Sequence, residues 1–343
     1  MAAAISDVQK WSGGHTDSIL CLDCSDSGVV VSGSENGECT LWTADGKVLK
    51  TISKSEDSVT AVCFSQRKPT KFFISSGNKI SEHDCQNLSE PVWTCEFNSE
   101  EVNQLALNSN EELLAACDDT GQVKVINLRE RKLHRTLRKH SNICTSVKFR
   151  KKKQWELVSG SMDECVVQWE CGRGRVMTIL DMKDFVKESM PGNAYLVNPP
   201  LVHSVDISGN DRLLACGLEN ATVELFEFQG KKGITEIGCL KGHTQGVSQV
   251  HFPRFKSTDC LVSAGNDGKI ILWDVSGNSA ASPCKAEDRE AGSSAGAMVE
   301  KFGKLSVIDH GDKINWITSM NTGNKEFVLV ADQTEFISQY RIC

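Results

Sequence analysis

The chain has 343 residues, of which 39% are hydrophobic and 24% are charged, and its formal net charge at pH 7 is −7. These proportions are those of an ordinary folded domain, and the acidic balance argues against general nucleic-acid binding, which usually needs a basic surface. The fifteen cysteines are an odd number and no secretory signal is evident, so we expect reduced thiols and a cytoplasmic or nuclear protein, or both. No apolar run approaches the ~20 residues of a membrane span.

One pattern of apolar residues recurs seven times. In its clearest copy, residues 240–274, an alternating strand is followed by a second apolar run, an Asn-Asp-Gly turn and a third strand that ends in Trp273-Asp274. An apolar anchor of the first strand recurs at positions 22, 62, 105, 147, 205, 250 and 317, which gives steps of 40, 43, 42, 58, 45 and 67 residues. A period of ~40–45 residues is typical of propeller blades, which bury their faces only against neighbouring copies.

The repeats predict an all-β fold, a single seven-bladed β-propeller. We expect the blades at about residues 12–53, 57–97, 100–138, 140–182, 201–240, 243–308 and 310–343. The last repeat stops after its third strand, and the strand-like segment 5–11 precedes the first repeat. Because an open sheet edge is unfavourable, we expect this N-terminal strand to pair with the last blade and close the ring.

The two long steps predict insertions. Residues 181–200 are expected to form a top-face loop that crosses the face carrying the repeat histidines. This loop is either a lid over the central opening or an insertion without function, which has arisen by sequence drift where the fold tolerates extra residues. Residues 276–301 are rich in Ser, Ala, Gly, Glu and Lys and contain almost no large apolar residue. They predict a flexible loop on the opposite face.

Three repeats carry a His, a Ser, an acid or amide, and a Trp at matching positions. These residues are His15, Ser32, Asn36 and Trp42, then His140, Ser159, Asp163 and Trp169, then His243, Ser263, Asp267 and Trp273. Their side chains can form a hydrogen-bonded line from the indole to the loop. Such a set looks like a catalytic relay, but its repetition in several blades favours a structural role.

The pairs Gly14-His15 with Trp42 and Gly242-His243 with Trp273-Asp274 resemble the repeats of the WD40 family, and the resemblance covers essentially the whole chain. It implies a non-catalytic protein–protein interaction scaffold, monomeric by itself and working within a complex. A Walker loop, a G-x-S-x-G elbow and a zinc-protease helix are all absent from the sequence. We therefore expect no enzymatic activity, no cofactor and no metal site.

The resemblance also suggests a partner. Some WD40 proteins are substrate receptors of the cullin-4 RING ubiquitin ligase and dock on its adaptor, the damage-specific DNA-binding protein 1. Members of that class often carry Trp-Asp-x-Arg at the end of a third strand, and the matching segment here is Ile126-Asn127-Leu128-Arg129. Arg129 is retained and can form charge-assisted hydrogen bonds with an acidic partner, but the Asp that would orient it is replaced. The candidate partners are then this adaptor and a substrate protein.

The alternative is a general assembly scaffold, or a reader of basic peptides such as histone tails, on the face that carries the histidines. Its acidic or amide residues would be Asn36, Asp118, Asp119, Asp163, Glu219 and Asp267, unless these residues only shape turns. Residues 129–153 contain eleven Lys or Arg and one acid, Glu130. This run is either ordinary solvated surface, a docking patch for an acidic partner or, at residues 150–153, a nuclear-import signal.

Overall fold

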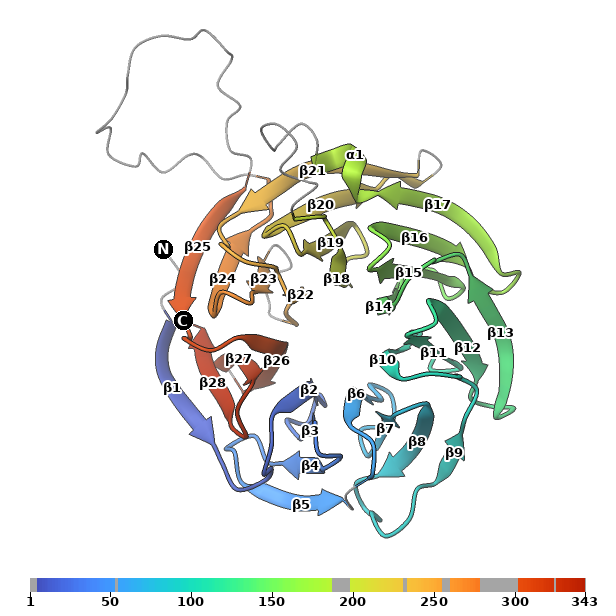
Figure 1. The fold of residues 1–343 in the computed structure, drawn as a ribbon. Coiled ribbons are helices and arrows are strands. Elements are labelled where there is room, and N and C mark those ends of the chain that lie inside the picture. The colour runs from blue at the N-terminus through green and yellow to red at the C-terminus, as the bar shows by residue number, and fades with distance from the viewer. Residues whose placement is uncertain are drawn as a thin grey trace, which may run out of the picture.

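The computed structural model describes residues 5–52, 55–186, 198–230, 233–254, 260–277, 302–323 and 325–342. Seven four-stranded antiparallel sheets form a ring (Figure 1), which confirms the predicted seven-bladed propeller. Their first strands surround a central channel, a cavity of about 480 Å³. We number the blades in chain order. In each blade the first strand lines the channel and the fourth lies at the outer rim.

The strands of the first four blades follow one another along the chain. Blade 1 consists of β2 (Ile19–Cys24), β3 (Val30–Ser34), β4 (Cys39–Trp42) and β5 (Val48–Ile52). Blade 2 consists of β6 (Val59–Phe64), β7 (Lys71–Ser76), β8 (Lys79–Asp84) and β9 (Trp93–Cys95). Blade 3 consists of β10 (Val102–Leu107), β11 (Leu113–Asp118), β12 (Gln122–Asn127) and β13 (Lys132–Arg138). Blade 4 consists of β14 (Cys144–Phe149), β15 (Glu156–Ser161), β16 (Cys165–Glu170) and β17 (Arg175–Asp181).

The last three blades complete the ring. Blade 5 consists of β18 (Val202–Ile207), β19 (Leu213–Leu218), β20 (Thr222–Phe228) and β21 (Ile234–Lys241). Blade 6 consists of β22 (Gln249–His251), β23 (Cys260–Ala264), β24 (Lys269–Asp274) and β25 (Gly303–Asp309). Blade 7 consists of β26 (Ile314–Thr322), β27 (Lys325–Asp332), β28 (Ile337–Ile342) and the N-terminal strand β1 (Ile5–Trp11).

The hydrophobic core is divided into seven clusters, one at each junction between neighbouring blades. The anchor residues of the inner strands supply them. Val147, for example, is fully buried in the cluster that joins blades 3 and 4. Each sheet therefore buries both faces, but only because a neighbour stands on each side.

Ring closure occurs as predicted. Strand β1 pairs antiparallel with β28, with Trp11 opposite Ile337. The Trp11 side chain is 1% exposed and its ring centroid lies 6.0 Å from that of Trp42 in blade 1. The N-terminal strand thus completes blade 7 and also packs against blade 1.

The start of the first insertion differs from the expected loop. Asp181 ends β17, and residues Met182–Val186 form the short helix α1, whose first turn is capped by a hydrogen bond from the Lys183 N–H to Asp181 Oδ1 (3.0 Å). Met182 and Val186 are buried in the cluster between blades 4 and 5, so apolar burial holds this segment in place. Residues 187–197 of the predicted top-face loop and residues 278–301 of the predicted flexible loop lie outside the described residues.

Replacing Trp11 tests the importance of closure. We expect Trp11→Ala to lower the free energy of unfolding by about 3–5 kcal/mol, because it removes a buried indole at the junction of two blades. Urea unfolding followed by circular dichroism measures the change. Val8→Ala is the matched control, since Val8 is on the same strand but 56% exposed, and its effect should stay below about 0.5 kcal/mol. Equal effects of the two substitutions would show that closure adds little stability.

Candidate interaction surfaces

The antiparallel blades give the propeller two different loop faces. Loops that enter the first strand of a blade, and loops between its second and third strands, lie at one end of the sheets, and we call this end the His face. Loops between the first and second strands, and between the third and fourth, lie at the other end. We call that end the Arg129 face, because Arg129 follows β12, the third strand of blade 3.

Blades 4 and 6 contain the complete hydrogen-bonded line from loop to indole. In blade 6, His243 Nδ1 is 3.0 Å from Asp267 Oδ1 and its Nε2 is 2.8 Å from Ser263 Oγ, which also accepts a bond from Trp273 Nε1 (2.8 Å). In blade 4 the same bonds join His140, Asp163, Ser159 and Trp169. The polar atoms of each line bond to one another within the blade. Such an arrangement stabilises the blade and leaves no group placed to act on a substrate.

Blade 1 differs from the expectation for Asn36. The Asn36 amide donates to Thr16 Oγ1 (2.7 Å), whereas Glu38 lies beside His15, with Oε2 3.6 Å from Nδ1. The longer glutamate side chain reaches the imidazole from a position two residues further along. Burial lowers the pKa of His15 to about 4, although the Glu38 carboxylate acts in the opposite direction. His15 and Trp42 still share the Ser32 hydroxyl.

Blade 7 contains a variant of the line that the spacing rule did not identify. His310 Nε2 is 2.8 Å from Asp332 Oδ2, and His310 Nδ1 is 2.6 Å from the Tyr340 hydroxyl. Tyr340 thereby replaces the Ser and Trp of the other blades. The only sequence signal was His310 itself at the repeat position, because a Tyr at a strand position has no fixed role in the pattern.

The two acidic residues of blade 3 that were predicted to bind a partner, Asp118 and Asp119, differ in their exposure. Asp118 is fully buried, accepts a hydrogen bond from Asn98 Nδ2 (2.8 Å) and caps the following turn, so it is not available to a partner. This corrects the prediction for Asp118, whose position in blade 3 corresponds to that of Asp332 in blade 7. Asp119 is exposed, with Oδ1 accepting a bond from Asn103 (2.8 Å).

Much of the acidity proposed for the His face is also used internally. Asp163 and Asp267 belong to the bonded lines, and Glu219 is 2.6 Å from the His203 ring. Glu101, a further acid on this face, directly precedes β10. Burial raises the pKa of its carboxyl group, and the nearby carboxylates of Asp119 and Asp57 raise this pKa further. Fewer acidic groups on this face are therefore free to meet a basic peptide than the sequence suggested.

Arg129 lies on the surface of the Arg129 face. It is exposed, and within the described ranges its side chain forms no hydrogen bond or ion pair. The adjoining Asn127 accepts a bond from the Glu130 N–H (2.9 Å), as Asp274 does from the Ser276 N–H in blade 6. Asn127 thus performs the turn-capping role of an Asp, but it carries no charge that would hold the guanidinium.

Arg129 borders a cavity of about 380 Å³ between blades 2 and 3. Basic side chains on its wall include Arg67, Lys68 and Arg131, and the acids include Glu111. The Glu111 carboxylate accepts bonds from the backbone N–H groups of the loop after β6, which partly satisfies its charge. The wall carries five basic and three acidic side chains, and two of the basic ones, Lys71 and Arg131, lie within 4.0 Å of Glu82.

The eleven basic residues of 129–153 do not form one patch. Lys148 points into the channel, 3.5 Å from Asp206, and Arg150 pairs with Glu156 and Asp211. The remainder are divided between the outer strand β13, the two ends of that strand and the loop that precedes β15.

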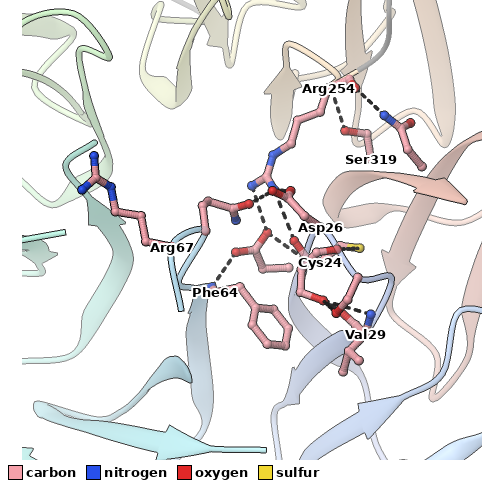
Figure 2. Close-up of polar contacts among 12 residues, drawn as sticks. Cys24, Asp26, Val29, Phe64, Arg67, Arg254 and Ser319 are labelled. Carbon is pink, nitrogen blue, oxygen red and sulfur yellow. Dashed lines mark hydrogen bonds and ion pairs between the residues drawn. The ribbon is translucent and has the colours of Figure 1, made fainter. Parts of the chain in front are cut away.

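At the Arg129 face a side chain crosses the mouth of the central channel, and no sequence pattern singled it out. Arg254, from blade 6, donates to Gln66 Oε1 (2.7 Å) and to the Cys24 carbonyl (3.3 Å), and its Nη1 is 3.4 Å from Asp26 Oδ1 (Figure 2). Arg67 points away from this group (Figure 2). Arg254 therefore links blade 6 to blades 1 and 2 across a cavity of about 480 Å³.

Comparison with known proteins agrees with this architecture. A WD domain, G-beta repeat model matches residues 7–43 and 234–274, and a NUP159/214 beta propeller model matches residues 40–197. The WD repeat-containing protein 53 homolog of Dictyostelium discoideum is 30% identical over 93% of this chain and 90% of its own length. Two more distant relatives are the ribosome biogenesis protein WDR12 homolog of Chlamydomonas reinhardtii (22% identity, 80% of this chain and 69% of that protein) and Protein SLOW WALKER 1 of Arabidopsis thaliana (32%, 46% and 29%).

Fold, repeats and comparisons together define a WD40 β-propeller, a class of proteins that generally bind other proteins and are not enzymes. Within that class the chain belongs to the family of WD repeat-containing protein 53. Within the described ranges no helix has the length and apolarity needed to cross a membrane.

The bonded line of blade 6 predicts a specific pH dependence. Burial raises the pKa of Asp267, but hydrogen bonds from His243 and from backbone N–H groups outweigh this and hold the pKa below its usual range. The stability that Asp267 contributes is therefore fully present above its unfolded pKa of about 3.9 and is lost as the pH falls through the lower folded value. We expect Asp267→Asn to cost about 1–3 kcal/mol at neutral pH, because an amide has a single accepting oxygen.

Urea unfolding from about pH 7 to about pH 3 measures this effect. The difference between wild type and Asp267→Asn should shrink as the medium becomes more acidic. Asp312→Asn is the control, since Asp312 is exposed and its carboxylate has no partner among the described residues. A difference that stays constant down to the lowest pH would contradict the role of the charged carboxylate.

Proposed function

We propose that this protein is a substrate receptor of the cullin-4 RING ubiquitin ligase that docks on the ligase adaptor through its Arg129 face. The observation that carries the proposal is the Arg129 side chain at the end of the third strand of blade 3, which is exposed and has no partner among the residues that the structure describes. It occupies the position of the Arg in the Trp-Asp-x-Arg pattern, with Ile126 and Asn127 in place of Trp and Asp.

The surroundings of Arg129 favour an acidic partner. A guanidinium binds a carboxylate through two parallel hydrogen bonds, which gives both energy and orientation. Arg67 and Lys68 border the same cavity and add positive potential that attracts an acidic surface, whereas Arg131 lies 4.0 Å from Glu82. The His face lies at the opposite end of the blades, so it stays open to a substrate protein while the adaptor is bound.

Binding of the purified adaptor to wild type, Arg129→Ala and Arg129→Glu tests this proposal. We expect Arg129→Glu to weaken binding at least ~10-fold, equivalent to about 1.4 kcal/mol, and Arg129→Ala to weaken it less. Lys79→Glu makes the same change of charge at an exposed position on the His face and should leave binding unchanged. Identical melting curves for all four proteins would show that folding is unaffected.

Two results would contradict the proposal in different ways. If wild type does not bind the adaptor at concentrations of about tens of micromolar, the ligase function should be abandoned, and the protein is better described as a general assembly scaffold. If wild type and Arg129→Glu bind equally well, the adaptor docks elsewhere and Arg129 has another role.

A further inference from the structure

Blade 4 presents an unusual tryptophan on the Arg129 face, in the loop between β14 and β15. All seven tryptophans of the chain lie in the described ranges, and Trp155 is the most exposed of them, with 45% of its surface accessible. Trp11, Trp42, Trp169 and Trp273 are each 3% exposed or less. Tryptophan is among the residues most often found at the energetic centre of protein interfaces.

The Trp155 ring is held in a defined position. The ring centroid lies 5.5 Å from that of the His134 ring on β13. The backbone carbonyl of Trp155 accepts a hydrogen bond from the Cys171 N–H (2.7 Å). The ring also lies against Gly172, where a Cβ atom would come within 3.1 Å of the indole. A large side chain that is ordered before binding loses little entropy when a partner covers it.

The loop before Trp155 is also fixed, because it is bonded to blade 3. The Lys151 carbonyl accepts a bond from Ser109 Oγ (2.7 Å), and Gln154 accepts bonds from the Asn110 N–H (3.1 Å) and Asn108 Nδ2 (3.3 Å). Polar contacts between two blades therefore hold residues 151–154, although the loop is on the surface. Such a loop is a preorganised surface.

The charges of this loop are not neutralised. The neighbouring Arg150 occupies the nearby acids, with Nη1 3.0 Å from Glu156 and Nη2 3.1 Å from Asp211. Lys151, Lys152 and Lys153 are exposed, and in the described part of the chain their ammonium groups form no hydrogen bond or ion pair. Three unpaired cations thus precede an exposed indole by two to four residues, on a protein whose net charge is −7.

We infer that Lys152, Lys153 and Trp155, together called the Trp155 surface, bind an acidic protein segment that carries an aromatic or large apolar side chain. The lysines attract the carboxylates, and the indole provides the apolar contact. A protein segment is favoured over nucleic acid, since single strands usually need several stacking aromatics in a basic groove. This inference does not depend on docking to the ligase adaptor.

Fluorescence anisotropy with a labelled peptide of alternating Glu and Asp around one central Phe tests the inference. We expect saturable binding that weakens with salt, and a loss of at least ~10-fold both in Trp155→Ala and in the double variant Lys152→Glu/Lys153→Glu. Trp155→Phe should retain most of the binding, because it keeps a flat ring. The matched control is Lys79→Glu/Lys313→Glu, which makes the same charge change at exposed positions on the His face and should have no effect.

Three results would overturn the inference. The first is equal binding of the peptide by wild type and Trp155→Ala, with melting curves that show both to be folded. The second is equal binding of a peptide in which Ala replaces the Phe, because the indole would then contribute nothing. The third is tighter binding of a single-stranded DNA oligonucleotide than of the peptide, which would indicate a nucleic-acid surface.

Discussion

No sheet of this protein can bury its faces alone, and all other features depend on that constraint. Each blade has two apolar faces, and each face is covered only by the next blade, so the core consists of seven junctions rather than one centre. A ring with one junction open would expose the faces of two sheets. The pairing of β1 with β28 prevents this, because it brings the first strand of the chain into the last blade.

The same constraint explains the polar residues of the channel. An inner strand pairs on one side only, so its other edge presents unpaired backbone groups. Side chains of the preceding blade satisfy some of them: Gln104 Oε1 accepts a bond from the Val147 N–H (2.7 Å), and Asp206 Oδ2 accepts one from the Phe252 N–H (2.8 Å). Arg254 adds a link across the channel mouth. Asp206, Lys148 and Arg254, charged groups of the channel that resemble a binding site, thus have structural partners.

The candidate binding groups are consequently side chains that do not take part in the hydrogen bonds within or between blades. Arg129 and the Trp155 surface lie on loops at one end of neighbouring blades, and their charged groups have no partner in the described part of the chain. Asp118, Asp163 and Asp267 have the same chemistry as binding residues, but hydrogen bonds within their blades already occupy them. A polar residue on this propeller is a candidate for binding only after its internal partners have been identified.

The sequence by itself determined the number of blades, the anchors of the inner strands and the closure by an N-terminal strand. The blade number and the anchors follow from apolar residues that alternate along a strand and recur at a regular spacing. The closure follows from a last repeat that is one strand short. The sequence also identified the complete lines of blades 4 and 6, because their Ser, Asp and Trp recur at constant intervals and their His precedes the first strand by the same number of residues. Arg129 was selected from a resemblance at one segment.

Only the tertiary structure decided which polar groups are free. Nothing in the spacing indicated that Glu38 instead of Asn36 would lie beside His15, or that Asp118 would be buried. Arg254 bonds to Gln66, which is 188 residues away in the sequence, and the Trp155 ring packs against His134 on β13 of another blade. Periodicity describes one strand and its neighbours, whereas exposure and pairing depend on residues that closure of the ring brings together from distant parts of the chain.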